Sequence, residues 1–269
     1  MNRIEERFAR LKKDGQKGFI VYIGAGDPNL EMTRRLALAF DKIGVDVLEL
    51  GVPFSDPLAD GLVNQLAAQR GLESGTTPAK VLQTVAAIRL QSQIPIVLYI
   101  YFNLIHRRGL ETFVREAAAA GVDGLLALDL PPEESGNYET LMARAGLSAI
   151  YLVAPTTPEA RIELIVRRGT GFIYYVSREG VTGMQEHVAT SIGNRVELLR
   201  KHTALPICIG FGISTPEQAR TLAQQADGAV VGSVLVNRIA EWGGERDLPQ
   251  KLEAFARPLA QAIHGGAGP

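Results

Sequence analysis

The sequence has one cysteine, no long apolar run and almost no net charge, and each absence excludes a class of protein. Cys208 cannot form an internal disulfide, and because it lies in the apolar run 206–209 we interpret it as a buried structural thiol rather than a nucleophile. No segment approaches the roughly 20 apolar residues that a membrane-spanning helix needs, and residues 1–7 are too charged for a signal peptide. The sequence therefore predicts a soluble protein of the cytoplasm.

Charge and histidine placement exclude further classes. The formal net charge of -1 gives no indication of the basic surface that nucleic acid or anionic lipid requires. No lysine falls inside a predicted strand, which argues against an aldolase that works through a Schiff base. The histidines show no ligand spacing, so we expect no metal site; they are His106, His187, His202 and His264.

The sequence does contain one recurring pair of elements, a helical pattern followed by a short apolar run. Runs that are apolar without alternation are typical of parallel strands buried on both faces. Eight such units within about 250 residues predict an α/β protein with a closed (β/α)₈ barrel, the TIM barrel. The predicted strands are 19–23, 47–50, 95–100, 124–128, 149–153, 171–176, 206–210 and 228–231.

The flanking segments complete the prediction of a single domain over residues 1–269. Apolar residues at helical spacing predict an extra N-terminal helix before the first strand, and a short helix is expected near 233–239, after the eighth. A doubly wound sheet is the structural alternative, but residues 24–29 lack the third glycine of a nucleotide fingerprint. Thr77, Thr157 and Thr215 each precede a proline, which predicts helix N-caps.

Carboxylates stand out where predicted strands end, the side of such a barrel that carries active sites. Glu49 lies within an apolar strand, where it is either a core residue with a partner or a functional acid. Asp60 before Gly61 is either a turn residue or a second functional acid, and together the two would serve acid–base chemistry. Asp56 suits a turn, and Asp129 could brace a loop or cap a helix.

Glycines cluster in three late loops, at 180–183, 210–214 and 232–233. Tight turns would explain each cluster alone. Glycines followed by a serine that opens a helix also expose backbone N–H groups to an anion, so we favour a phosphate ester as ligand.

At these residues the sequence resembles the tryptophan synthase α subunit family. The matches run almost from end to end and include 26–28, 49–61, 174–178, 180–183 and 210–214. The resemblance implies a TIM-barrel lyase that cleaves indole-3-glycerol phosphate to indole and glyceraldehyde 3-phosphate in tryptophan biosynthesis. It also implies a β-subunit partner in an α2β2 assembly, with pyridoxal phosphate on the β subunit and no cofactor on this chain.

The resemblance also implies roles for individual residues. Glu49 and Asp60 would be catalytic, with Tyr174, Thr182 and Asp129 in support. The phosphate would be held by Gly183, Gly212, Gly232 and Ser233, and the partner would contact Asp56, Pro57 and Asn103. The indole would be flanked by Tyr22 and Phe211, with Ile100, Phe102 and Ala127 as its wall.

Three positions depart from the family pattern. Leu62 stands where proline is usual, Leu104 follows Asn103 in place of proline, and Tyr22 replaces a phenylalanine. We expect the loops at 53–60 and 177–190 to have little local structure of their own, and the first to be looser without its proline. Two alternatives stay open: a free-standing lyase that releases indole, and a non-catalytic activator of a β subunit.

Overall fold

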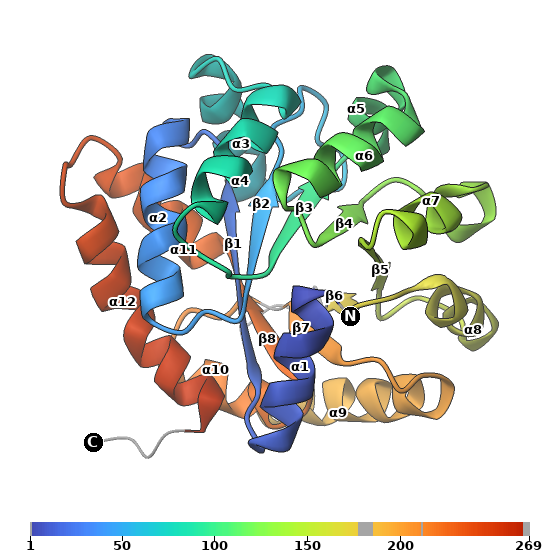
Figure 1. The fold of residues 1–269 in the computed structure, drawn as a ribbon. Coiled ribbons are helices and arrows are strands. Elements are labelled where there is room, and N and C mark those ends of the chain that lie inside the picture. Colours follow the sequence, from blue (N-terminus) through green and yellow to red (C-terminus); the bar gives the residue numbers. More distant parts are fainter. Residues whose placement is uncertain (1, 177–184, 211, 266–269) are drawn as a thin grey trace.

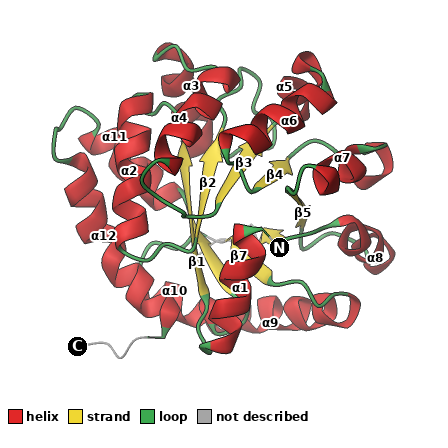
Figure 2. Cartoon of the chain, in the orientation of Figure 1, coloured by secondary structure: helices red, strands yellow, loops and turns green. Residues whose placement is uncertain are grey.

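The computed structural model describes residues 2–176, 185–210 and 212–265, and within them eight parallel strands close into a barrel in chain order (Figures 1 and 2). Neighbouring strands pair in sequence, and β1 closes the barrel by pairing with β8. The strands are β1 (Gly18–Gly24), β2 (Val47–Gly51), β3 (Ile96–Ile100), β4 (Gly124–Ala127), β5 (Ser148–Val153), β6 (Ile173–Val176), β7 (Ile207–Gly210) and β8 (Gly228–Val231).

Helices surround this barrel on its outside (Figure 2). In the described part of the chain no helix is long and apolar enough to cross a membrane. The helices are α1 (Arg3–Lys13), α2 (Leu30–Lys42), α3 (Leu62–Glu73), α4 (Pro78–Arg89), α5 (Phe102–Arg108), α6 (Leu110–Ala120), the 3₁₀ turn η1 (Pro132–Glu134), α7 (Tyr138–Arg144), α8 (Glu159–Arg168), α9 (Gln185–His202), α10 (Pro216–Ala223), α11 (Ser233–Trp242) and α12 (Leu248–His264).

The strands read as continuous apolar runs because both of their faces are buried. In β1, Phe19 and Val21 pack with the surrounding helices, whereas Ile20 packs in the barrel interior. This alternation continues around the barrel and divides the core into an outer layer and an inner layer. Among the side chains of the strands, only those of the inner layer can reach a site at the barrel mouth.

Helix α1 covers the lower end of the barrel, opposite the ends toward which β1 to β3 run in Figure 1. Its apolar face, Ile4, Phe8 and Leu11, joins the inner layer, and the Phe8 and Phe172 ring centroids lie 5.8 Å apart. Asn2 fixes the start of the helix through a capping box with Glu5. The helix therefore keeps water from entering the barrel at this end.

The predicted strands all form, with ends shifted by at most two residues, and the N-terminal helix is confirmed. Thr77 and Thr215 are confirmed as N-caps. The prediction for Thr157 is wrong, because α8 begins at Glu159 with Pro158 as its N-cap, and the Thr157 hydroxyl instead accepts a hydrogen bond from the Ala154 N–H in the preceding turn. The helix after β8 is longer than expected and continues to Trp242.

Truncating a residue of the α1 seal should destabilise the protein. Leu11 is only 4% exposed, so Leu11→Ala removes packing in the inner layer and should lower the free energy of unfolding by about 2–5 kcal/mol. The same truncation at Leu90, which is 85% exposed, should change it by less than about 0.5 kcal/mol. Urea denaturation measures both, and equal losses for the two variants would contradict the role of α1 as a seal.

Candidate active site

A hollow of about 460 Å³ opens at the carboxyl ends of the strands, the end of the barrel where the sequence places the site. It is lined by residues of all eight strands or of the loops that follow them, and by the start of α3 and of α11. The lining residues with side chains or backbone relevant to the site are Tyr22, Asp60, Asn64, Tyr99, Leu128, Leu152, Tyr174, Val176, Gly210, Gly212, Val230, Gly232 and Ser233.

Glu49 lies on the inner face of β2 and is fully buried. It pairs in register with Tyr22 of β1, whose side chain lines the hollow. Among the described residues neither carboxyl oxygen of Glu49 has a hydrogen-bond partner. Burial without a partner disfavours the charged form and raises the pKa of Glu49 to about 8. The described residues therefore do not supply the partner expected of a core glutamate, and the raised pKa favours the protonated form of Glu49 at neutral pH.

Two tyrosines, Tyr22 and Tyr174, flank this carboxyl from the inner faces of β1 and β6. A Cβ atom on Gly51 would lie 2.3 Å from the Tyr22 hydroxyl oxygen, and one on Gly210 would lie 2.6 Å from that of Tyr174. Glycine is therefore required at both strand ends to leave room for the phenols. Burial, followed by the charges of Asp60 and Glu49, raises the pKa of Tyr22 well above its ordinary value. Burial and then Glu49 do the same for Tyr174, so both remain neutral hydroxyls.

Asp60 is held in place by two other tyrosines, Tyr99 in β3 and Tyr101 directly after that strand. Tyr99 Oη donates to Asp60 Oδ1 at 2.8 Å, and Tyr101 Oη donates to Asp60 Oδ2 at 2.8 Å. Tyr101 Oη also accepts a hydrogen bond from the Ala59 N–H at 2.9 Å. The Asp60 end of this loop is therefore positioned by long-range hydrogen bonds to the barrel rather than by local structure of its own. Leu62 is the first residue of α3, which begins there without the usual proline.

Three of the residues expected around the indole lie elsewhere. Ile100 and Ala127 belong to the outer layer against the helices, and Phe102 packs against that same layer at the start of α5. For Ile100 and Ala127 the prediction is off by one position in the strand alternation, which moves a side chain to the opposite face, whereas Phe102 already belongs to α5. The hollow is lined instead by their neighbours Tyr99 and Leu128, together with Leu152.

The remaining sequence candidates are distributed between the mouth and the outer surface. Asp129 Oδ1 accepts a hydrogen bond from the Phe102 N–H at 2.6 Å and so braces the start of α5. Gly232 is the N-cap of α11, and Ser233 is its first residue. On the outer surface Asp56 and Asn103 are exposed and Pro57 is half-buried. Thr182, Gly183 and Phe211 lie outside the described residues.

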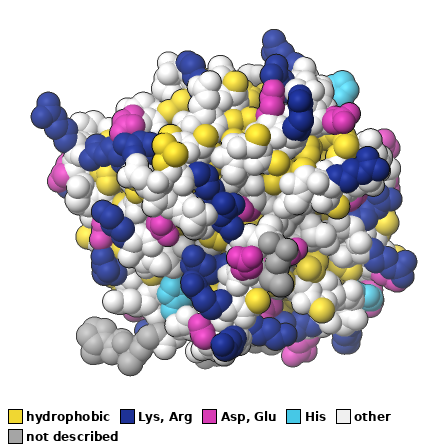
Figure 3. Space-filling model, viewed as in Figure 1, with side chains coloured by type: hydrophobic (Ala, Val, Ile, Leu, Met, Phe, Trp, Pro, Cys, Tyr) yellow, Lys and Arg dark blue, Asp and Glu magenta, His cyan; other side chains and the backbone are white. Residues whose placement is uncertain are grey.

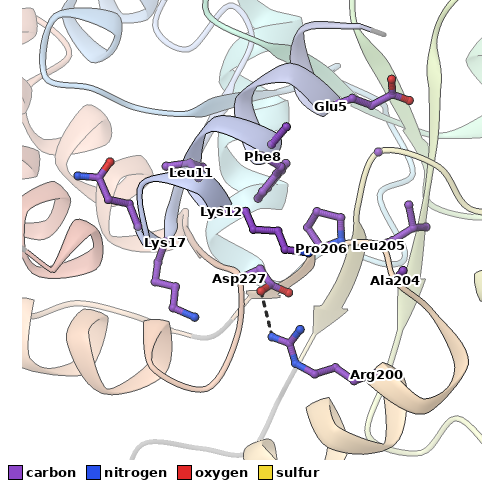
Figure 4. A pocket seen from close by; sticks show the side chains of 14 residues that line it. Glu5, Phe8, Leu11, Lys12, Lys17, Arg200, Ala204, Leu205, Pro206 and Asp227 are labelled. Carbon is purple, nitrogen blue, oxygen red and sulfur yellow. Dashed lines mark hydrogen bonds and ion pairs between the residues drawn. The ribbon is translucent and has the colours of Figure 1, made fainter.

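A second hollow, of about 550 Å³, lies at the opposite end of the barrel between α1 and the segments that precede β7 and β8 (Figure 4). Two acids line it, Glu5 and Asp227, and Asp227 is already paired, since Arg200 Nη2 donates to Oδ1 at 3.0 Å and the Ile207 N–H donates to Oδ2 at 2.9 Å. Asp60 lines the hollow at the mouth and does not line this one. The described residues contain no group of three His, Cys, Asp or Glu side chains placed to hold a metal ion.

Comparison with known proteins decides the family. The sequence matches the family model described as "Tryptophan synthase alpha chain" over residues 8–264. The chain belongs to the tryptophan synthase alpha chain family. The tryptophan synthase alpha chain of Opitutus terrae is 54% identical over 260 residues, which cover 96% of this chain and 98% of the relative. That of Geotalea daltonii is 47% identical over 263 residues, which cover 98% and 99%.

Solved tryptophan synthase structures share the fold. Tryptophan synthase subunit alpha of Legionella pneumophila superposes with a TM-score of 0.91 at 37% identity, covering 98% of this chain and 99% of that chain. A tryptophan synthase chain of M. tuberculosis superposes with a TM-score of 0.88 at 29% identity, covering 98% and 100%. The resemblance and the TIM barrel are thereby confirmed. As a tryptophan synthase alpha chain, the protein is a lyase that carries out the alpha reaction of tryptophan biosynthesis.

The buried acid should make stability depend on pH. The pKa of Glu49 is about 8 in the folded chain and near the ordinary 4.5 when unfolded. Between these values the folded chain keeps a proton that the unfolded chain releases, so stability falls as pH rises through this range and the loss is complete above it. Glu49→Gln, which cannot ionise, should therefore gain stability over the wild type, by a few kcal/mol at about pH 9 and little at about pH 5.

Urea denaturation at both pH values measures this difference. The exposed Glu197 supplies the matched control, since Glu197→Gln should change stability equally at the two pH values. A pH-independent effect of Glu49→Gln would show that the Glu49 carboxyl is charged in the folded protein.

Proposed function

We propose that this chain cleaves indole-3-glycerol phosphate to indole and glyceraldehyde 3-phosphate by proton transfer through Glu49, with Asp60 as the second catalytic carboxylate. The observation that carries the proposal is the fully buried Glu49 carboxyl, without a hydrogen-bond partner among the described residues and with a pKa raised to about 8. A group with this pKa can both donate and accept a proton near neutral pH, which the reaction requires of its acid–base catalyst.

Glu49 supplies the proton that the indole ring must gain. Protonation of ring carbon C3 by the Glu49 carboxyl interrupts the aromatic system and places positive charge on the ring nitrogen. The substrate 3′-hydroxyl then loses its proton to the Glu49 carboxylate, its oxygen becomes the aldehyde carbonyl, and the electrons of the C3–C3′ bond return to the ring. The products are indole and glyceraldehyde 3-phosphate, and Glu49 ends the cycle protonated as it began.

Asp60 stabilises the charge that this step develops. In our proposal its carboxylate accepts a hydrogen bond from the ring N–H, and that bond strengthens as positive charge builds on the nitrogen. Tyr22 and Tyr174 line the hollow on either side and keep water from the Glu49 carboxyl beneath them. Protonation at C3 and charge stabilisation at nitrogen are thus assigned to different carboxylates.

The phosphate of the substrate is assigned to the late loops. Gly212, Gly232 and Ser233 all line the hollow. Because the first N–H groups of a helix have no acceptor within it, the start of α11 offers donors and a partial positive charge to a phosphate. Gly232 has no side chain to occupy these donors, and a Cβ atom there would approach the Tyr22 Cβ to 3.3 Å. We add Gly183 to this cradle from the resemblance alone.

The family implies a β-subunit partner, and we propose an α2β2 assembly in which the β subunit carries pyridoxal phosphate and this chain needs no cofactor. An exposed apolar surface supports the site of contact: Leu58 is 91% exposed and Leu62 69% exposed, next to the Asp56 and Pro57 of the same loop. Hydrophobic atoms also reach the surface in the upper half of Figure 3, in the region that α3 to α6 occupy in Figure 1. Asn103 on α5 completes the proposed contact. We place the reaction in the cytoplasm.

Replacing Glu49 tests the proposed chemistry. Glu49→Gln keeps the shape of the side chain but cannot transfer a proton, so indole release should fall by ~100-fold or more while glycerol phosphate binds as in the wild type. Gly232→Val should do the reverse, weakening glycerol phosphate binding and raising KM more than it lowers kcat. Near-normal indole release by Glu49→Gln would contradict the mechanism. Indole production by the wild type with no partner present would exclude the non-catalytic activator.

Adding a β subunit tests the proposed partner. Ordering of the loop by the partner should accelerate indole release at least ~10-fold over the isolated chain. Leu58→Asp and Asp56→Ala should lose most of this gain, whereas Leu90→Asp, equally exposed but distant in the fold, should keep it. An isolated chain that already works at full speed and ignores the β subunit would favour the free-standing lyase.

A further inference from the structure

The mouth of the barrel contains a tyrosine that neither the sequence motifs nor the mechanism above uses. Tyr99 lies on the inner face of β3, and its ring lines the hollow together with Tyr22, whose centroid is 5.0 Å away in an edge-to-face arrangement. Its hydroxyl donates to Asp60 Oδ1 at 2.8 Å. Tyr99 thus lines the hollow proposed for the indole ring and also binds Asp60, the carboxylate proposed to accept the N–H of that ring.

The bond to Tyr99 spans two independent parts of the chain. Asp60 ends a loop whose neighbouring Leu58 is 91% exposed, whereas Tyr99 belongs to a barrel strand. The loop therefore takes its side-chain position from a rigid element. Burial, followed by the Asp60 charge, raises the pKa of Tyr99 well above its ordinary value, so the phenol keeps the hydrogen that it donates.

Tyr99 and Tyr101 hold the carboxylate in different ways. Tyr101 binds Asp60 Oδ2 and also accepts from the Ala59 N–H, so it secures the loop backbone as well. The Tyr99 hydroxyl donates to the carboxylate itself. A carboxylate has about four acceptor positions, so Asp60 can keep both phenols and still accept one ring N–H.

We propose that Tyr99 is a positioning residue that sets the orientation of Asp60 toward the ring nitrogen. The proposal rests on the function proposed above, in which Asp60 accepts the ring N–H. Because that bond gains strength only as charge develops on the nitrogen, a misdirected Asp60 affects the transition state more than the bound substrate. Loss of the Tyr99 hydroxyl then lowers kcat and leaves KM nearly unchanged.

The test removes the hydroxyl and keeps the ring. Tyr99→Phe should lower kcat for indole release by ~10-fold and change KM by less than ~2-fold. Tyr151→Phe is the matched control, because Tyr151 Oη also donates to a carboxylate, Glu139 at 2.6 Å, but packs in the outer layer. The control should retain wild-type kcat. Thermal melts of both variants confirm that each is folded.

A double-mutant cycle distinguishes positioning of Asp60 from a role as pocket wall. Tyr99→Phe is combined with Asp60→Ala, and indole release is followed in single turnovers with enzyme in excess. If Tyr99 acts through Asp60, its substitution should change the rate by less than ~2-fold once Asp60 is gone. An equal loss in both backgrounds, or wild-type kcat in Tyr99→Phe, would overturn the proposal. Failure of the proposed function is a separate result, in which the wild-type chain releases no indole.

Discussion

Burial of the Glu49 carboxyl costs desolvation free energy that no hydrogen bond within the described residues offsets. The closed barrel is the structure that makes this burial feasible: strands pack on both sides of β2, α1 covers the lower end, and two tyrosines stand above. Each of these features excludes water, and together they raise the pKa of Glu49 to about 8. The acid–base property of the site is therefore produced by the packing of the entire barrel rather than by a single neighbour.

Two carboxylates at one mouth are held in opposite environments. Glu49 is buried without a hydrogen-bond partner among the described residues, whereas both oxygens of Asp60 accept hydrogen bonds from phenols. The first environment favours a proton donor, and the second fixes an acceptor in one orientation. Such a division allows one side chain to move a proton while the other stabilises charge on the ring. Gly51 and Gly210 contribute by leaving space for Tyr22 and Tyr174, the tyrosines that flank Glu49.

In the loop between β2 and α3, residues close together in the chain have different surroundings. Its Asp60 end is bonded to Tyr99 and Tyr101 of the barrel, whereas Leu58, two residues earlier, is almost fully exposed. A protein that covers Leu58 would thus act on a segment that adjoins the Asp60 carboxylate directly. This arrangement provides a short physical connection between partner binding and the site, carried by the loop itself.

The sequence by itself determined the eight strands, the N-terminal helix and the two carboxylates, because apolar runs, capping residues and the motif at 49–61 are all local patterns. It did not determine which face of a strand points inward. Strands buried on both faces carry no polar alternation, so the sequence pattern could not correct the inward placement of Ile100 and Ala127 that the resemblance implied, and both lie in the outer layer. Only the tertiary structure decided that Glu49 has no hydrogen-bond partner in the described part of the chain and that Tyr99 binds Asp60, 39 residues away in the chain. Desolvation and long-range hydrogen bonds depend on which segments barrel closure brings together, and no local pattern encodes that.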